Sequence, residues 1–200
     1  MFRCRGGKQL WLLVSLVFFV VPLLASCNSD KSVTVVLSGK ATFPSEVSGP
    51  LGAVPVSNAS FSVLNLDGGT PNPVAFGATD SGGNFAATVS AANVVAIVIQ
   101  SPPPGGALGS VRVSGLIDSR NGSVAKNFDG VTDIACEAGV TSIVDGSVAA
   151  FRMDESRIAI LEAAATQVIA ELGVDYTDKE SVSAAARRLR EITNNGETLP

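Results

Sequence analysis

The chain has 200 residues, of which 46% are hydrophobic, and 14 basic against 18 acidic side chains give a formal net charge of −4. An acidic chain without a run of Lys and Arg lacks the clustered phosphate contacts that nucleic-acid binding requires, so that class of function is excluded. The complete absence of histidine excludes Ser-His-Asp and Cys-His catalysis and removes the commonest zinc ligand.

The first 26 residues have the three parts of an export signal. These parts are a basic region, an apolar region and a small-residue cleavage site (Arg3, Arg5 and Lys8; 10–24; Ala25 and Ser26). The apolar region holds about 15 residues, whereas a helix needs roughly 20 to span a bilayer. We therefore expect 1–26 to be a cleaved signal peptide, with the cleavage between Ser26 and Cys27.

A cysteine placed directly after such a cleavage site resembles the lipobox of bacterial lipoproteins. The resemblance implies that Cys27 receives a thioether-linked diacylglycerol and an N-acyl chain such as palmitate, and becomes the first residue of the mature protein. Two or more chains are enough for stable anchoring in a lipid bilayer. Asn28 stands where aspartate would favour inner-membrane retention in the enterobacterial sorting pattern, so the outer membrane is favoured. Plain secretion and an uncleaved anchor are the alternatives.

A short tether, residues 27–31, connects the expected lipid to the first patterned segment. It spans at most about 18 Å when fully extended, so we expect the following domain to lie close to the lipid head groups. Removal of residues 1–26 takes three basic residues and no acidic residue, which leaves a formal net charge of −7. The lipid, and not the protein surface, is therefore expected to hold the protein on an anionic membrane.

From residue 32 to residue 117 apolar and polar residues alternate, which is typical of strands with one buried face. The alternating runs lie at 33–43, 60–63, 85–89, 95–99 and 111–117. In the last run, the alternation puts Arg112 and Ser114 on the solvent-facing side. Turn-forming Gly, Pro and Asp residues separate the runs. About seven short strands at this spacing predict an antiparallel β-sandwich over 32–117.

Three short motifs stand within this region: Ser38-Gly39-Lys40-Ala41, the segment 55–63 and the segment 78–85. Together they resemble the carboxypeptidase regulatory-like domain, a transthyretin-like β-sandwich, over roughly residues 33–100. The residues at the motif positions are Gly39, Ala59, Thr79, Asp80, Gly83 and Phe85. The resemblance implies a transthyretin-like fold for the region.

The Asp80 carboxylate is suited to accept hydrogen bonds from backbone N–H groups of its own turn, where Gly82 or Gly83 can take a positive φ. Phe85 is then expected to anchor the returning strand. A calcium site at Asp80 would need six to eight oxygen ligands, and no neighbouring acidic residue supplies them. We therefore interpret Asp80 as a turn residue.

The pattern changes after residue 117. Residues 118–129 are polar and contain Asn121-Gly122, which indicates a hairpin tip or an interdomain loop. From 130 to 200 the apolar spacing is helical and predicts a module of three amphipathic helices. We expect the helices to begin at Asp129, at Asp154 and at a capping box, Thr177 to Glu180, and to end at Asp145-Gly146, Gly173 and 194–196. The fold class is thus mainly β with α.

Candidate chemistry is sparse. With Cys4 in the signal and Cys27 acylated, only Cys136 remains; no internal disulfide can form, and we interpret Cys136 as a buried small hydrophobe. Glu155 and Glu162 lie on one helix without a pattern that would bring them together in a cleft. A basic cluster (Arg187, Arg188 and Arg190) can bind a carboxylate or phosphate partner, or can pair with acidic neighbours (Glu180, Glu191 and Glu197).

The sequence therefore predicts a non-catalytic, lipid-anchored cell-envelope protein that acts as a structural or protein-interaction module. No catalytic, cofactor-binding or metal-binding residue is predicted. The expected partners are the bilayer, through acylated Cys27, and an envelope protein. The alternative is a glycan- or peptide-binding lipoprotein that uses sandwich loops 67–73 or 101–108, although stacking aromatics are scarce. A hydrolase that uses carboxylates or a Ser-Lys pair is the third hypothesis. Whether the helical module packs on the sandwich or on a partner stays open.

Overall fold

Two β-sheets and three long helices form most of the described chain. This computed structural model describes residues 33–48, 53–92, 94–106 and 109–195, all within one compact unit that begins at Val33. Ser26, Cys27 and the tether 27–31 lie outside the described residues. The strands are β1 (Thr34–Lys40), β2 (Ser60–Asn65), β3 (Asn72–Ala78), β4 (Asn84–Ser90), β5 (Val94–Ser101), β6 (Val111–Asp118) and β7 (Val124–Ala125). The helices are α2 (Ser45–Ser48), α3 (Gly130–Val144), α4 (Glu155–Leu172) and α5 (Lys179–Asn195), with 3-10 turns at Pro104–Gly106 and Ala150–Arg152.

The two sheets have the strand orders β4-β1-β7 and β3-β2-β5-β6. Every strand pair is antiparallel except β1 and β7, which run parallel with Leu37 opposite Val124. The predicted combination of a β-sandwich with three C-terminal helices is confirmed. All strand pairs within the predicted sandwich are antiparallel, as expected. The expectation of a loop over 118–129 is wrong at β7, a two-residue strand that pairs in parallel with β1. The chain there leaves β6 and runs back along β1.

Alternation at period two produces the core between the sheets. In β4 each buried residue is followed by an exposed one, and Phe85 is 4% exposed. The Phe85 ring stacks on Phe128 with ring centroids 4.9 Å apart, and Phe61 meets Phe85 edge-on at 6.0 Å. Phe85 therefore anchors its strand as predicted, because its ring contacts an aromatic side chain from each side of the sandwich core.

Strand β3 lies outside the predicted runs. Six of its seven residues are exposed and one is partly exposed, so the segment carries no alternation of buried and exposed positions. The predicted loop 67–73 accordingly ends two residues inside this strand. β3 is held by its antiparallel pairing with β2 at the edge of the four-stranded sheet. A strand that buries neither face has no alternation of apolar and polar residues, so its pairing at a sheet edge cannot be predicted from the hydrophobic pattern.

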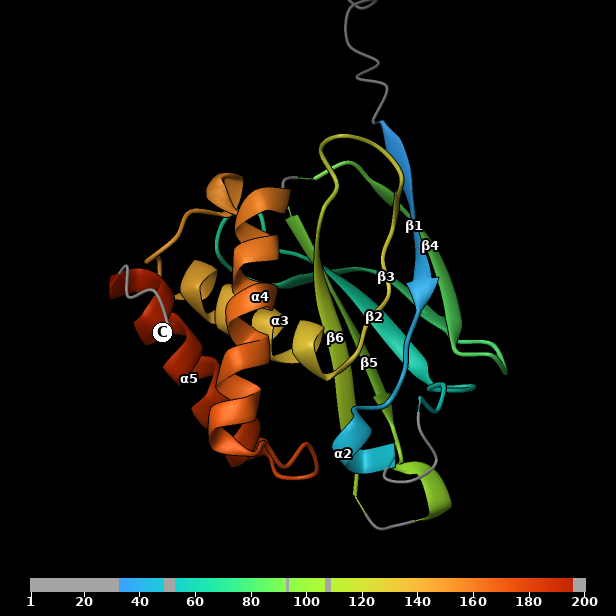
Figure 1. Cartoon of the computed structure of the whole chain (residues 1–200). Coiled ribbons are helices and arrows are strands. Elements are labelled where there is room, and N and C mark those ends of the chain that lie inside the picture. Colours follow the sequence, from blue (N-terminus) through green and yellow to red (C-terminus); the bar gives the residue numbers. More distant parts are fainter. Residues whose placement is uncertain (1–32, 49–52, 93, 107–108, 196–200) are drawn as a thin grey trace, which may run out of the picture. The chain divides into compact units, whose positions relative to one another are not determined.

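The helices cover the β6 side of the outer face of the four-stranded sheet, so the helical module packs on the sandwich, while the β3 side of that face stays exposed. Helix α3 lies against β6, and α4 and α5 pack on α3, as Figure 1 shows. Ser114, expected on a solvent-facing side, is 1% exposed, and the Arg112 side chain is 30% exposed. That expectation is wrong because β6 is buried on both faces, by the sandwich core on one side and by α3 on the other.

Two of the three predicted helix starts are confirmed. The Asp129 carboxylate accepts hydrogen bonds from the N–H groups of Val131 and Thr132, and Asp154 caps α4 in the same way. Gly173, at φ 64°, ends α4 as expected. At α5 the expected capping box of Thr177 and Glu180 is not formed. The Asp178 carboxylate instead accepts from the Glu180 N–H at 3.0 Å, and the Thr177 hydroxyl donates to Asp175 at 2.7 Å.

The motif residues from the resemblance have structural roles. The Asp80 carboxylate accepts hydrogen bonds from the N–H groups of Gly82 and Asn84 at 2.8 and 2.9 Å, and Gly83 takes φ 78°. These contacts confirm the turn interpretation of Asp80. Hydrogen bonds from Asn84 chiefly hold the pKa of Asp80 below its usual range. The buried Thr79 hydroxyl donates to the Val56 carbonyl at 2.6 Å and accepts from the Ala59 N–H at 2.9 Å.

Thr79→Val is expected to destabilise the protein by about 2 kcal/mol, because it leaves a buried carbonyl and a buried N–H without partners while keeping the side-chain volume. Thr79→Ser, which keeps the hydroxyl, is the matched control. Urea unfolding followed by circular dichroism gives both free energies of unfolding. A loss in Thr79→Ser with little or no loss in Thr79→Val would show that the methyl group, and not the hydroxyl, is what Thr79 contributes.

Candidate functional site

A cavity of about 260 Å³ lies between the edge strand β6 and the N-terminal part of α5. Arg112 of β6 and two residues of α3, Asp133 and Glu137, form one part of its lining. Tyr176, in the α4–α5 connection, and Lys179, the first residue of α5, form the other. The packing of α3 on β6 thus brings charged side chains from the sheet and the helical layer to one place.

An ion cluster of three charged side chains, Arg112, Asp133 and Glu137, occupies this cavity wall. Arg112 Nε donates to Asp133 Oδ1 at 3.0 Å, and Arg112 Nη1 pairs with Glu137 Oε2 at 2.7 Å. The Ser114 hydroxyl donates to the same Asp133 oxygen at 2.5 Å. The Asp133 side chain is 1% exposed. Within the described part of the chain, Asp133 Oδ2 and Arg112 Nη2 have no hydrogen-bond partner.

Burial and charge shift the pKa values at this site. Burial raises the pKa of Asp133, and the contacts with Arg112 and Ser114 offset only part of that effect. Desolvation alone would lower the pKa of Arg112, but the fields of Asp133 and Glu137 outweigh it and raise the pKa further above its usual value. The guanidinium therefore stays charged, and it is shared between two carboxylates.

Cys136 and Tyr176 border the cluster. Burial raises the pKa of the Cys136 thiol to about 12, so the thiol stays protonated at neutral pH. This agrees with the interpretation of Cys136 as a buried small hydrophobe. Burial also raises the pKa of Tyr176, with further contributions from Glu46, Asp133 and Asp129. The surroundings of the Tyr176 hydroxyl are thus acidic, and neither side chain is activated as a nucleophile.

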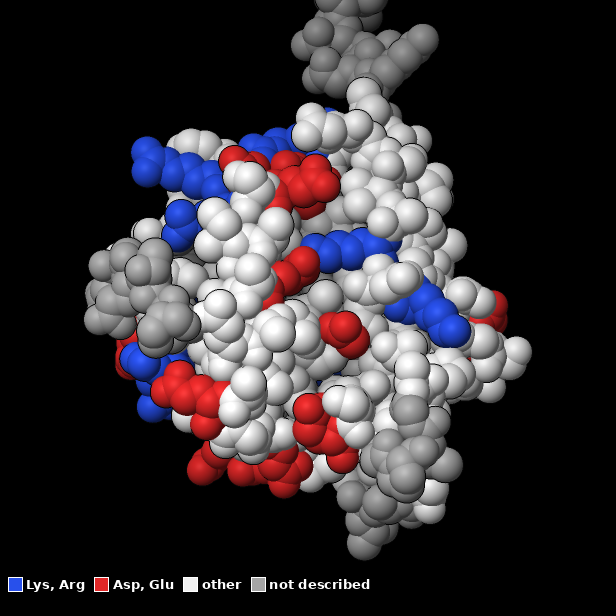
Figure 2. Space-filling model, viewed as in Figure 1, with Lys and Arg blue, Asp and Glu red and all other residues white. Residues whose placement is uncertain are grey.

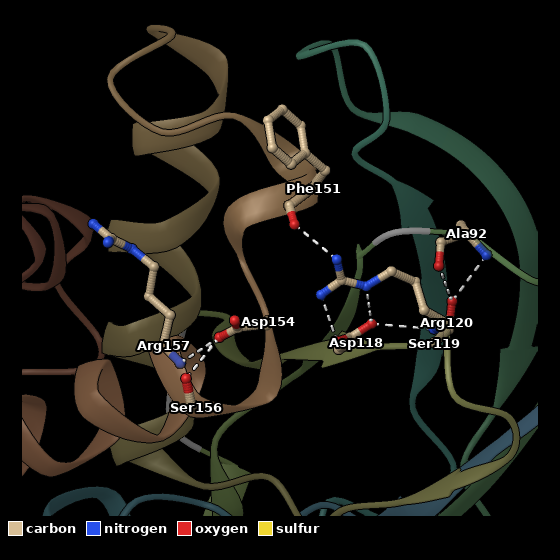
Figure 3. Close-up of polar contacts among 8 residues, drawn as sticks. All are labelled: Ala92, Asp118, Ser119, Arg120, Phe151, Asp154, Ser156 and Arg157. Atoms are coloured by element: carbon tan, nitrogen blue, oxygen red, sulfur yellow. Dashed lines mark hydrogen bonds and ion pairs between the residues drawn. The ribbon is translucent and has the colours of Figure 1, made fainter.

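A second group of charges joins the end of β6 to the 3-10 turn that precedes α4 (Figure 3). Arg120 binds Asp118 through two hydrogen bonds, Nε to Oδ1 at 2.8 Å and Nη2 to Oδ2 at 2.6 Å, and donates through Nη1 to the Phe151 carbonyl at 2.7 Å. These bonds to Arg120 hold the pKa of Asp118 below its usual range. Nearby, the Asp154 carboxylate accepts from the Arg157 N–H and the Ser156 hydroxyl. This group joins two layers of the fold through contacts that are already made.

The predicted basic cluster pairs largely with acidic neighbours. Arg190 binds the Asp145 carboxylate and the Ser142 hydroxyl. Arg188 lies 3.8 Å from both Glu171 and Glu191. Pairing with acidic residues is therefore favoured for both arginines, but with a predicted partner, Glu191, only at Arg188, because Arg190 pairs with Asp145. Glu197, which was also considered as a partner, lies outside the described residues.

The two acidic residues considered on α4 are not brought together. Glu162 pairs with Lys126 of the sandwich at 2.5 Å, while Glu155 lies in the first turn of α4. On the face that Figure 2 shows, acidic and basic side chains meet at several places over the helical layer, and no broad basic area gathers there. Among the residues the structure describes, no group of three metal-ligating side chains is present.

Sequence reasoning missed the ion cluster. The alternation predicts a solvent-facing position for Arg112, and the helical spacing of 130–200 assigns no role to Asp133. A usable signal is present in each element. Arg112 stands next to Val111 in a strand whose following residues, 113–117, are all apolar or small. Asp133 stands among the apolar residues of a helix that packs closely. A charged residue in each of two apolar elements is an indication that the two pair when buried.

Within the described ranges, no helix has both the length and the apolar character needed to cross a membrane. The predicted loop 101–108 includes a 3-10 turn, and its residues 107–108 lie outside the description.

No family model matches the chain, and no curated protein matches it. Among solved structures, the shaft pilin SpaA from Lactobacillus rhamnosus GG aligns with 48% of this chain and 49% of its own, at 14% identity and a TM-score of 0.33. The TIE protein of Bacillus anthracis aligns over 48% of this chain and 17% of its own, at 15% identity and a TM-score of 0.31. A 9R-lipoxygenase from Cyanothece aligns over 76% of this chain and 30% of its own, at 11% identity and a TM-score of 0.29. The chain thus spans about half the length of the pilin, and these similarities assign neither a family nor a function to it.

Proposed function

We propose that the protein is a non-catalytic lipoprotein of the bacterial cell envelope, anchored through Cys27 and acting as a structural or protein-interaction module. The observation that carries this proposal is the sequence of a basic region, an apolar region and small residues that ends at Cys27. The described body supports it through its chemistry. Its one free cysteine in the described range is buried, and its most buried carboxylate is held by Arg112 and Ser114.

Replacement of the lipid-bearing sulfur tests the anchor. In Cys27→Ser cells the protein is expected to leave the membrane fraction almost completely, because serine cannot form the thioether to diacylglycerol. Fractionation with immunoblotting measures the distribution, and mass spectrometry of the mature N-terminus measures the added acyl mass. Cys136→Ser is the matched control and keeps the anchor. Equal membrane retention of Cys27→Ser and the native chain would overturn the proposal.

A second candidate function is ligand binding, which the sequence placed at loops 67–73 or 101–108. The specific observation that favours it is at another place, the cavity beside Asp133. A buried carboxylate oxygen without a hydrogen-bond partner is energetically unfavourable, by about 1–3 kcal/mol or more when the group is charged. Such an oxygen in the wall of a cavity is satisfied when a ligand with an N–H or O–H group occupies that cavity.

A further inference from the structure

The cavity between β6 and α5 has a negative inner wall. Asp133 and Glu137 share the single positive charge of Arg112, which leaves one excess negative charge when both carboxylates are ionised. Asp133 Oδ2 has no hydrogen-bond partner among the described residues, and Glu137, whose side chain is 25% exposed, pairs with Arg112 through Oε2. A ligand ammonium group fits this wall, because it brings the missing charge and up to three N–H donors.

The apolar part of the lining is small. Val182 and Tyr176 belong to the lining, and only a small part of each side chain is exposed, 7% and 5% respectively. These side chains can pack on a few methylene or methyl groups adjacent to the ammonium. A volume of about 260 Å³ is below the range of roughly 300–1,000 Å³ in which drug-sized ligands bind. The space therefore suits a molecule of the size of an amino acid or a short peptide and is too small for an oligosaccharide.

The mouth of the cavity has the opposite charge. Lys179 is exposed, lines the cavity, and forms no ion pair with any residue in the described ranges. Its ammonium repels a ligand that is only cationic and attracts a carboxylate. The side chains of Ser110 and Ser183 lie in the same lining and offer hydroxyl groups to such a carboxylate. The cavity therefore has a negatively charged inner wall and a positively charged mouth, and this arrangement is complementary to a zwitterion.

We propose that this cavity binds a small zwitterion, an amino acid or short peptide, whose ammonium meets Asp133 and Glu137 and whose carboxylate meets Lys179. The proposal rests on the ligand-binding candidate above and gives that candidate its ligand chemistry. It differs from the sandwich-loop alternative, because the recognising groups come from β6, α3 and α5.

Titration calorimetry on the full-length acylated protein in detergent tests the proposal with three probes: alanylalanine, N-acetyl-alanylalanine and alanylalanine amide. Alanylalanine is expected to bind saturably. The N-acetyl form, which has no ammonium, is expected to bind at least about tenfold more weakly, and the amide several-fold more weakly. Equal binding of all three probes, or no saturable binding of alanylalanine at millimolar concentration, would overturn the proposal and leave the cavity as a water site.

Variants assign the two ends of the ligand. Lys179→Gln is expected to weaken alanylalanine but not its amide, whereas Glu137→Gln is expected to weaken both, because both carry the ammonium. Each replaced side chain is partly or largely solvent-exposed, so folding is retained, which circular dichroism verifies. Lys40→Gln, on the exposed end of β1, is the matched control and leaves all three affinities unchanged. A protein that stays anchored through Cys27 but binds no probe contradicts this inference alone, and a protein that binds alanylalanine but is not anchored contradicts the anchoring alone.

Discussion

Gly39→Ala is expected to destabilise the protein by more than about 3 kcal/mol, one of the largest effects available to a single methyl group. An added Cβ at Gly39 would lie 1.7 Å from the Lys126 carbonyl oxygen and 2.9 Å from Cζ of Phe85. The carbonyl is backbone and cannot turn away alone, because the Lys126 N–H donates to the Ser38 carbonyl at 2.8 Å and the Phe128 N–H donates to the Lys40 carbonyl at 2.8 Å. The whole segment that runs beside β1 would have to move.

A matched control separates steric exclusion from backbone conformation. Gly173 ends α4 at φ 64°, and a Cβ built there meets no atom within 4 Å. Gly173→Ala is therefore expected to cost about 1 kcal/mol, the strain of a left-handed conformation alone. Thermal and urea unfolding of both variants measures the difference. Losses of similar size in the two variants would contradict the close approach of Lys126 to β1.

Gly39 also shows how far the sequence alone can lead. The resemblance marks Gly39 as a motif position. The reason for glycine there is a close approach of the Lys126 backbone, and Lys126 lies 87 positions further along the sequence. Local signals succeeded where the cause is local: the turn at Asp80, the cap at Asp129 and the stop at Gly173 all depend on neighbouring backbone groups. Contacts between distant segments carry no such local pattern.

The same distinction explains the missed elements. The two-residue strand β7 exists through its pairing with β1, and β3 exists through its pairing with β2, so neither is determined by its own hydrophobic pattern. The candidate site is harder still to predict. Arg112 comes from a strand and Asp133 from a helix. The alternation in β6 predicts a solvent-exposed Arg112, because a sequence pattern within one strand does not show that α3 covers that face. Only the packing of the two elements brings the charges together.

Arg112→Met is expected to lower the free energy of unfolding at pH 7 by about 3–5 kcal/mol, because it leaves the buried Asp133 carboxylate without its cation. The double variant Arg112→Met/Asp133→Leu is expected to recover most of this loss, since replacing a whole buried ion pair by apolar side chains is far less unfavourable than breaking it. Glu137, whose side chain is 25% exposed, can turn to water in both variants. Arg188→Met, which removes contacts at 3.8 Å on the surface, is the control and changes stability by less than about 1 kcal/mol.

The pH dependence gives this prediction a second, independent readout. Burial raises the pKa of Asp133 above its ordinary value of 3.8, and removal of Arg112 raises it further. A carboxyl whose pKa is higher in the folded than in the unfolded chain favours folding below the unfolded pKa, and this contribution is lost as the pH rises through the folded pKa. The deficit of Arg112→Met relative to the native chain is therefore expected to narrow when the pH is lowered from 7 towards about 4. Urea unfolding at both pH values measures it; a constant deficit, or additive losses in the double variant, would show that Asp133 is not held as a buried charge by Arg112.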